Sequence, residues 1–239
     1  MSKPIFLTAR WENLLMANYE VSPQLLQPLL PPHTELDLFR GKCYVSLVGF
    51  MFLNTKVLGI PVPFHRNFEE VNLRFYVRHR HQNEWRRGVV FVKEIVPKWA
   101  ISWVANTIYG EPYVCLPMSH QILHTPTALS VTYGWEYQQT PFQMSAKAEP
   151  KAVEMATDSE EEFITEHYWG YTRRSDSRTD EYGVEHPRWE VYPVNDYQIN
   201  VAFGKLYGRS FSFLNQQRPD SVLLAKGSDI VVRQGSRLE

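Results

Sequence analysis

Charged and aromatic side chains stand side by side in several short segments, and this mixture is the clearest indication of a chemical site. The segments cover residues 64–78, 91–97, 109–113, 167–171 and 186–194. Within the first segment, Glu70, Asn72 and Arg74 alternate with apolar residues. A repeat of two residues is the period of a β-strand, so the three polar side chains share one face. That face is polar enough to line a cavity or to meet water.

Signatures of familiar catalytic and nucleotide-binding sites do not occur in the chain. It has no Gly-x-Gly-x-x-Gly, Walker, Gly-x-Ser-x-Gly or His-Glu-x-x-His motif. Two histidine pairs have spacings that metal ligands use, His79 with His81 and His120 with His124. The first pair lies among arginines near an expected turn, and prolines on both sides of the second pair argue against a regular helix. We therefore expect no bound metal and no cofactor.

Charge and composition exclude several classes of partner. The 239 residues carry a net charge of −1 with a pI near 6.7, which gives no electrostatic footprint for nucleic acid or an anionic membrane. No stretch approaches the roughly 18 apolar residues of a membrane-spanning helix, and the N-terminus lacks the features of a signal peptide. Cys43 and Cys115 lie in apolar contexts typical of buried, reduced thiols. We expect a cytoplasmic protein.

The pattern of apolar residues predicts a mainly β (α+β) fold in one domain that spans residues 1–239. Aromatic residues make up 14% of the chain and favour a β-rich core. Strands are expected at residues 9–21, 43–53, 70–80, 88–96, 130–137, 142–148, 190–194, 199–203, 222–225 and 230–233.

Helices are expected after Ser22, from Pro97 to Gly110, and from Asp158 towards Tyr168. The last two strands are expected to form a hairpin through a turn at residues 226–229. Many strands with few helices imply a closed or nearly closed antiparallel sheet, with the helices packed outside it.

The mixed segments, the opening Ala9-Arg-Trp-Glu-Asn and the Tyr44-Val-Ser-Leu-Val-Gly-Phe strand together resemble the uncharacterised YqjF-like bacterial family over almost the whole chain. That family is related to acetoacetate decarboxylase, and the remote resemblance to the decarboxylase covers mainly residues 6–118. The resemblance implies a cone-shaped antiparallel β-barrel with an internal, ligand-sized cavity. It implies that Arg10 faces a ligand carboxylate, and it allows for a homo-oligomer because the relatives assemble.

The chain departs from the decarboxylase where that enzyme has its reactive lysine. Tyr113 and Val114 stand at the matching positions, and Ser46 replaces an assisting glutamate. An imine-forming lysine needs an apolar pocket that holds its amine unprotonated; the decarboxylase is the standard example of this effect. Lys93 is the best substitute, but it neighbours Glu94 on a strand, so only one of the two enters the barrel. Lys93 is otherwise a surface or ion-paired lysine.

Ten residues are candidates for the walls of the cavity. They are Arg10, Arg74, Glu94, Tyr109, Glu111, Tyr113, Tyr168, Tyr171, Trp189 and His65. The arginines suit a carboxylate or phosphate, and Glu111 or Glu94 suits a general base if burial raises its pKa. The simpler alternatives are a cross-strand Arg74–Glu94 pair, aromatic residues that belong to the core, and a His65 side chain that hydrogen-bonds a loop.

Two classes of function fit these residues. The first is an enzyme that acts on an organic acid or carbonyl compound by acid–base chemistry rather than through an imine. The second is a non-catalytic protein whose barrel holds a small apolar or acidic organic ligand. A catalytic site needs a buried titratable group beside the anion-binding arginine, whereas a binding protein needs only shape and satisfied polar groups.

Overall fold

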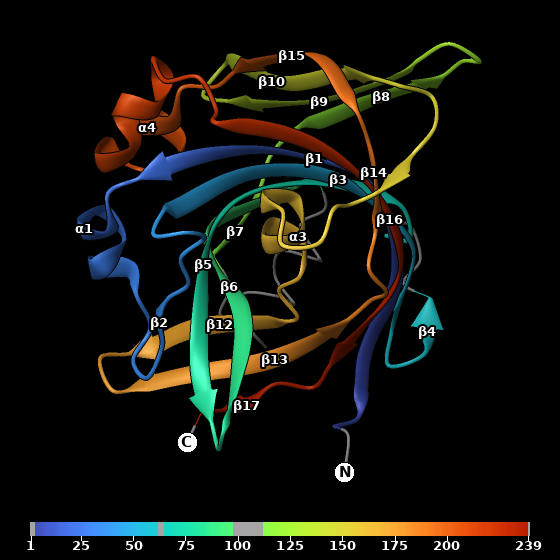
Figure 1. The fold of residues 1–239 in the computed structure, drawn as a ribbon. Helices are drawn as coiled ribbons and strands as arrows, with labels where there is room; N and C mark the ends of the chain where they lie inside the picture. Colours follow the sequence, from blue (N-terminus) through green and yellow to red (C-terminus); the bar gives the residue numbers. More distant parts are fainter. Residues whose placement is uncertain (1–2, 62–64, 98–111, 239) are drawn as a thin grey trace.

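A computed structural model describes residues 3–61, 65–97 and 112–238 of the chain. Thirteen strands among these residues form the main sheet (Figure 1). Its central strands are β1 (Ile5–Val21), β3 (Cys43–Val57), β5 (Phe68–His81), β6 (Glu84–Val96), β12 (Trp169–Ser175), β13 (Arg178–Glu185) and β16 (Ser221–Arg233). Short strands add to its edges, namely β2 (Glu35–Leu36), β4 (Ile60–Pro61), β7 (Tyr113–Cys115), β11 (Val153–Glu154), β14 (Glu190–Tyr192) and β17 (Ser236–Arg237).

The seven central strands pair in a ring. The order β16-β1-β3-β5-β6-β12-β13 returns to β16 because β13 also pairs with β16, at Val184 opposite Val232. Six of these seven pairings are antiparallel, but β6 pairs with β12 in parallel, Gly88 opposite Trp169. The mainly β fold is therefore confirmed, and the sheet is mixed rather than purely antiparallel. We refer to these strands as the ring.

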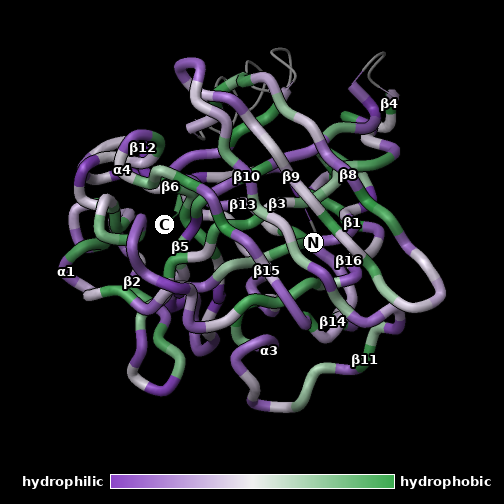
Figure 2. Tube along the Cα trace, turned by 90° about the horizontal axis from the view of Figure 1, so that it is seen from above, coloured by the Kyte–Doolittle hydropathy of each residue, from purple (hydrophilic) through white to green (hydrophobic). Residues whose placement is uncertain are grey.

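A second, four-stranded sheet lies against the outer face of the ring. Its order is β15 (Val194–Asn200), β10 (Thr140–Ala148), β9 (Leu129–Tyr137) and β8 (Met118–His124). Figure 2 views the molecule from the side of this sheet, whose strands run across the main sheet. Along β9 buried residues alternate with more exposed ones, so one face of this sheet packs inward while the other meets solvent.

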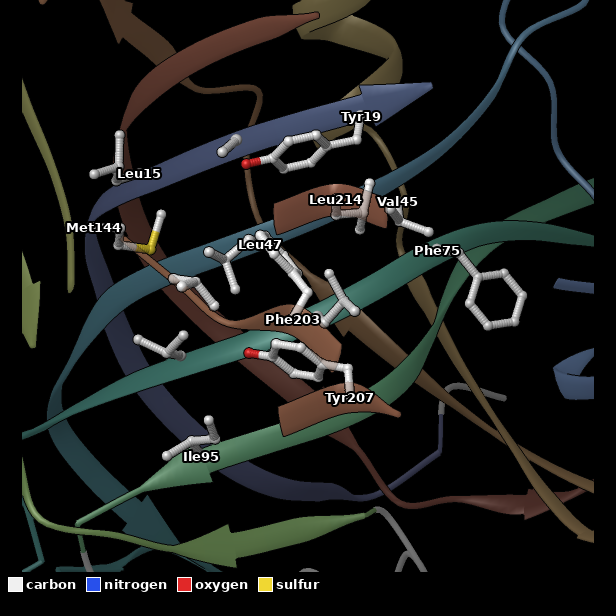
Figure 3. Packing of buried hydrophobic residues seen from close by; sticks show 14 of the residues in the cluster. Leu15, Tyr19, Val45, Leu47, Phe75, Ile95, Met144, Phe203, Tyr207 and Leu214 are labelled. Carbon is white, nitrogen blue, oxygen red and sulfur yellow. The ribbon is translucent and has the colours of Figure 1, made fainter. Parts of the chain in front are cut away.

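The outer face of the ring carries a dense apolar core. Alternate residues of the ring strands, such as Leu47 and Phe75, pack there against Tyr133 and Met144 of the second sheet. Two short helices complete this core, α4 (Phe203–Tyr207) and the 3-10 helix η2 (Arg209–Asn215), as Figure 3 shows. The 4-residue α1 (Pro23–Leu26) continues into η1 (Gln27–Leu29) and buries Leu26 in the same core.

The inner face of the ring packs against α3 (Glu160–Thr165), which lies within the curve of the strands in Figure 1. The Ser159 side chain caps this helix by accepting a hydrogen bond from the backbone N–H of Glu162, at 3.1 Å. Phe163 of the helix contacts the rings of Tyr44 and Tyr76 on the inner face, with ring centroids 6.5 and 5.5 Å away. The expectation that every helix packs outside the sheet is therefore wrong for α3.

Other element predictions also need correction. The expected hairpin at 226–229 does not form, because β16 continues from Ser221 to Arg233 and Gly227 bends it with a φ of 81°. A Cβ there would lie 2.0 Å from the carbonyl oxygen of Trp11, so glycine permits the close approach. Phe203 begins a helix rather than ending a strand. The helix expected from Pro97 to Gly110 falls almost wholly outside the described residues.

Two further expectations concern membrane-spanning helices and the burial of the two cysteines. In the part of the chain that the structure describes, no helix is long and apolar enough to cross a membrane. Cys43 is buried as expected, but Cys115 is exposed at the end of the short strand β7, which lies at the edge of the sheet beside β6.

Candidate functional site

A cavity of about 250 Å³ lies inside the ring. Every one of the seven ring strands contributes lining residues, and Thr165 at the end of α3 adds another. Most of the lining is apolar or aromatic, which is usual for a site that binds a small organic molecule.

Strand β5 brings a polar stripe into this cavity. Glu70, Asn72 and Arg74 line it, whereas Val71 and Leu73 point outward into the apolar core. This is the two-residue alternation that the sequence predicts for the segment, and the polar face does line a cavity.

The Glu70 carboxyl is the centre of the polar cluster. It is 2% exposed, and its Oε1 accepts a hydrogen bond from Asn72 Nδ2 at 2.9 Å. Its Oε2 accepts a second bond from the hydroxyl of Tyr113 at 3.2 Å. Burial raises the pKa of Glu70 to about 7, because the hydrogen bonds and the nearby Arg74 charge only partly offset the loss of water. Near neutral pH the carboxyl is therefore present in both protonation states.

Tyr113 links Glu70 to a second buried carboxyl, Glu94. Strand β7 runs parallel to β6 and places Tyr113 beside Glu94, with which the phenol also shares a side-chain hydrogen bond. Burial, together with the two carboxylates, raises the pKa of Tyr113 well above its usual value, so its hydroxyl stays protonated and can donate.

Lys93 and Glu94 are neighbours on β6, and their side chains point to opposite faces of the sheet, as strand geometry requires. Glu94 is buried and lines the cavity, whereas Lys93 leaves the ring on the opposite face. The Lys93 amine donates to the carbonyl oxygen of Leu206 and lies 5.9 Å from the ring centroid of Tyr207. Lys93 therefore belongs to the outer core, and burial lowers its pKa.

Arg74 is a cation in the cavity wall without an ion pair among the described residues. Its Nη2 donates to the carbonyl oxygen of Ile164 at 3.3 Å, and its guanidinium lies 5.6 Å from the ring centroid of Tyr76. Its Nε is buried and has no hydrogen-bond partner within residues 3–61, 65–97 and 112–238. The strand register places Glu94 opposite Asn72, so the alternative of a cross-strand Arg74–Glu94 pair is not what the described residues form.

His167, two residues after the end of α3, adds a buried imidazole to the lining. Its Nε2 lies 3.1 Å from Oδ2 of Asp37, which also accepts a bond from Arg87 Nε at 2.6 Å. Burial lowers the pKa of His167 to about 4, so the ring is neutral at pH 7 and donates its Nε2 proton to Asp37. Its Nδ1 is then an acceptor, and no partner for it occurs in the described part of the chain.

Aromatic rings form the other part of the wall. Trp11 makes edge-to-face contacts with Phe50, Phe52 and Trp189, with centroid distances of 5.3, 5.7 and 6.2 Å. Trp189 in turn stacks on the His186 ring at 4.1 Å and donates its indole N–H to Ser228 Oγ. We call Trp11, Phe50, Phe52 and Trp189 the aromatic wall.

The structure brings five of the predicted site residues to the cavity. They are His65, Arg74, Glu94, Tyr113 and Trp189. Sequence reasoning did not single out Glu70, Asn72 or His167, although the first two belong to the predicted polar face.

Other predicted site residues lie elsewhere. Arg10 is on the opposite side of β1 from Trp11, and its guanidinium pairs with Glu12 at 2.5 Å and with Asp229 at 3.5 Å. The Tyr168 hydroxyl donates to Glu166, and Tyr171 is fully buried in the outer core.

Tyr109 and Glu111, the two remaining candidates, fall outside the described residues. Among the residues that are described, no group of three or more His, Cys, Asp or Glu side chains could hold a metal ion.

The sequence matches the model of a known protein family. The model of the DUF2071 family, described as an uncharacterized conserved protein, matches residues 8–229. The uncharacterized protein YqjF of Bacillus subtilis (strain 168) is 37% identical over 112 residues. That match covers 46% of this chain and 45% of YqjF, so it spans less than half of the relative's length.

Solved structures with a similar fold include acetoacetate decarboxylases and an enzyme of enduracididine biosynthesis. An acetoacetate decarboxylase-like enzyme from Sphingomonas wittichii RW1 has a TM-score of 0.66 at 13% identity, over 99% of this chain and 94% of that one. Acetoacetate decarboxylase from Legionella pneumophila has a TM-score of 0.64 at 12% identity, over 100% and 90%. The enduracididine biosynthesis enzyme MppR, complexed with pyruvate, has a TM-score of 0.64 at 11% identity, over 100% and 92%. At these identities the likeness shows the fold alone.

Proposed function

The chain belongs to the DUF2071 family of uncharacterized conserved proteins, and we propose that it binds a small organic acid inside a closed barrel and exchanges a proton with it. The ring of strand pairings and the cavity inside it support the barrel. The observation that carries the reaction is the Glu70 carboxyl, which is buried in the cavity, held by Asn72 and Tyr113, and has a pKa of about 7.

Glu70 has the properties of a general acid–base catalyst. Proton transfer is most efficient when the pKa of the catalytic group lies near the working pH. As a carboxylate, Glu70 takes a proton from the carbon next to a ligand carbonyl. As a carboxylic acid it returns that proton to carbon or to oxygen. Once Glu70 is protonated, the Tyr113 hydroxyl can turn its single proton from Glu70 to the negative charge on the ligand.

Arg74 is the residue that we assign to the ligand's carboxylate. A planar guanidinium binds a carboxylate through two parallel hydrogen bonds, and the buried Nε of Arg74 has no partner among the described residues. A related fold supports this ligand class, since the enzyme MppR forms a complex with pyruvate.

Imine chemistry is not part of the proposal. None of the described residues that line the cavity is a lysine, and Lys93 lies on the other face of its strand. Tyr113 is placed to donate a hydrogen bond in the region where the decarboxylase has its reactive lysine.

Binding is tested by thermal shift with small carboxylic and keto acids. A ligand at about 100 times its Kd stabilises the folded state by about 2.7 kcal/mol. We expect Arg74→Met to abolish the shift and Arg10→Met to keep it, because Arg10 lies outside the cavity. An acid that stabilises all three proteins equally would contradict the assignment of Arg74.

Proton transfer is tested separately, by following the exchange of the methyl protons of pyruvate for deuterium with NMR. We expect the wild type to accelerate the exchange and Glu70→Gln to lose that acceleration. Glu69→Gln is the matched control, because Glu69 neighbours Glu70 but pairs with His120, at 3.2 Å. Equal exchange with and without the protein would remove the catalytic part of the proposal.

A non-catalytic binding protein is the alternative function. Both oxygens of Glu70 already accept hydrogen bonds from within the protein, as a purely structural carboxyl would. Ligand binding without proton exchange would favour this alternative.

A further inference from the structure

The cavity is larger than the polar cluster requires. Its volume is about 250 Å³, whereas a cavity of about 150 Å³ is enough to hold benzene. By this scale the space fits a ligand of about ten non-hydrogen atoms. An acid as small as pyruvate would leave much of the volume empty, so the ligand must carry an additional apolar group.

The aromatic residues of the cavity lining indicate where this apolar group of the ligand lies. The strand register places Trp11 opposite Phe52, and Phe52 opposite Phe68, so three neighbouring strands present a row of aromatic rings. Phe52 stacks on Phe68 at 4.8 Å, and Trp11 meets Phe52 edge-to-face at 5.7 Å. These rings line the cavity and offer both faces and edges to a ligand.

Along β5 the cavity lining changes from apolar to polar and then to positively charged. Its cavity-facing residues run from Phe68 through Glu70 and Asn72 to Arg74. Phe50 lies opposite Glu70 on the neighbouring strand, so the aromatic wall reaches the acid–base cluster directly. A ligand that satisfies this order has an apolar end, a polar centre and an anionic end.

From this order we infer that the ligand is an aromatic organic acid, such as an aryl-substituted keto acid. Its ring packs against Trp11, Phe50 and Phe52, its carbonyl lies at Glu70 and its carboxylate binds Arg74. This inference rests on the proposed function, because it names the chemical class of the acid held by the same site. The buried aromatic contacts favour a planar ring over an aliphatic ring of similar size.

The experiment compares three acids by isothermal titration calorimetry on the full-length protein. Phenylpyruvate is the aromatic probe, its cyclohexyl analogue has a ring of similar size without aromaticity, and pyruvate has no ring. We expect phenylpyruvate to bind at least ~10-fold more tightly than pyruvate, because it fills the apolar end. We also expect it to bind ~3- to 10-fold more tightly than the cyclohexyl analogue.

Variants locate the preference in the aromatic wall. Trp11→Leu is expected to remove the advantage of phenylpyruvate over the cyclohexyl analogue. Trp85→Leu is the matched control, since Trp85 is an exposed tryptophan outside the cavity. If Trp11→Leu does not fold, the three ligands with the wild type decide the question alone.

The outcomes separate this inference from the proposed function. Pyruvate or the cyclohexyl analogue binding as tightly as phenylpyruvate would overturn the aromatic class and leave the binding of an organic acid standing. If none of the acids binds, or if Arg74→Met binds them all unchanged, the proposed function fails and the inference fails with it.

Discussion

The two faces of the ring are built from alternate residues of the same strands, yet they differ in packing and charge. On the outer face, Leu47 and Phe75 are fully buried against the second sheet and α4. On the inner face, Glu70 and Arg74 line a cavity. Burying polar groups beside a void costs stability, and the dense apolar packing of the outer face offsets that cost. The outer face therefore provides most of the stability, and the inner face holds the candidate ligand site.

The largest expected effect is a loss of stability, and it differs between a truncated side chain on the outer face and one on the inner face. Leu47→Ala on the outer face should lower the free energy of unfolding by about 2–5 kcal/mol, because close neighbours surround the lost atoms on all sides. Leu14 lines the cavity, so its side chain already adjoins a void. Leu14→Ala should therefore lower the free energy of unfolding by less, near the lower end of that range. Urea denaturation measures both. A larger cost for Leu14→Ala would reverse the assignment of the two faces.

Glu70 should make the free energy of unfolding depend on pH. Its folded pKa of about 7 lies above its usual value of 4.5, so the folded state holds the proton more tightly. The contribution to stability is fully present below pH 4.5 and is lost as the pH rises through 7, by about 3 kcal/mol in total. Glu70→Gln should remove this decline, as seen by urea denaturation between pH 4.5 and 8. A parallel decline in both proteins would show that Glu70 is not responsible.

His167 should produce a pH dependence of the opposite sign. Its folded pKa of about 4 lies below its usual value of 6.5, so the folded state holds the proton less tightly. Stability is then fully present above pH 6.5 and is lost as the pH falls through 4, by up to about 3 kcal/mol. The depressed pKa of Asp37, which is bonded to His167 and Arg87, acts in the same direction.

This histidine effect is measured against the background of Glu70→Gln, where the opposing carboxyl is absent. We expect His167→Gln to flatten the remaining loss of stability between pH 6.5 and 4, as followed by thermal unfolding. An unchanged acid limb in the double variant would show that other groups cause it.

The smallest expected effect is that of Arg10. Its guanidinium is 38% exposed and pairs with Glu12 and with the exposed Asp229, so solvent screens both interactions. Arg10→Ala should change the free energy of unfolding by less than about 1 kcal/mol. Arg74→Ala is the comparison on the inner face, and there acid binding is expected to be lost. Loss of acid binding in Arg10→Ala would contradict this prediction and would show that Arg10 contributes to the binding site.

The sequence predicted the fold and part of the site wherever a local repeat decided the outcome. The two-residue alternation along β5 was enough to sort Glu70, Asn72 and Arg74 from the apolar residues. It could not decide which of Lys93 and Glu94 enters the cavity, because that depends on the register of β6 against β5. The hairpin prediction at 226–229 was wrong because Gly227 also permits a bend inside one long strand.

Contacts between distant segments were beyond sequence reasoning. His167 meets Asp37 across 130 positions of the chain, and nothing near either residue marks the pair. Arg10 was assigned to the ligand through a remote resemblance, whereas the alternation along β1 sends Trp11 into the cavity and Arg10 away from it.

The protonation of Glu70 is the most direct test of the account. Its measurement is a pH titration of the side-chain carboxyl resonances by carbon-13 NMR, with Glu70→Gln identifying the signal, in the absence and presence of phenylpyruvate. We expect a carboxyl signal that titrates near pH 7, disappears in Glu70→Gln, and shifts when the acid binds. A Glu70 signal that titrates near 4.5 and ignores the ligand would contradict a buried acid–base group in the cavity.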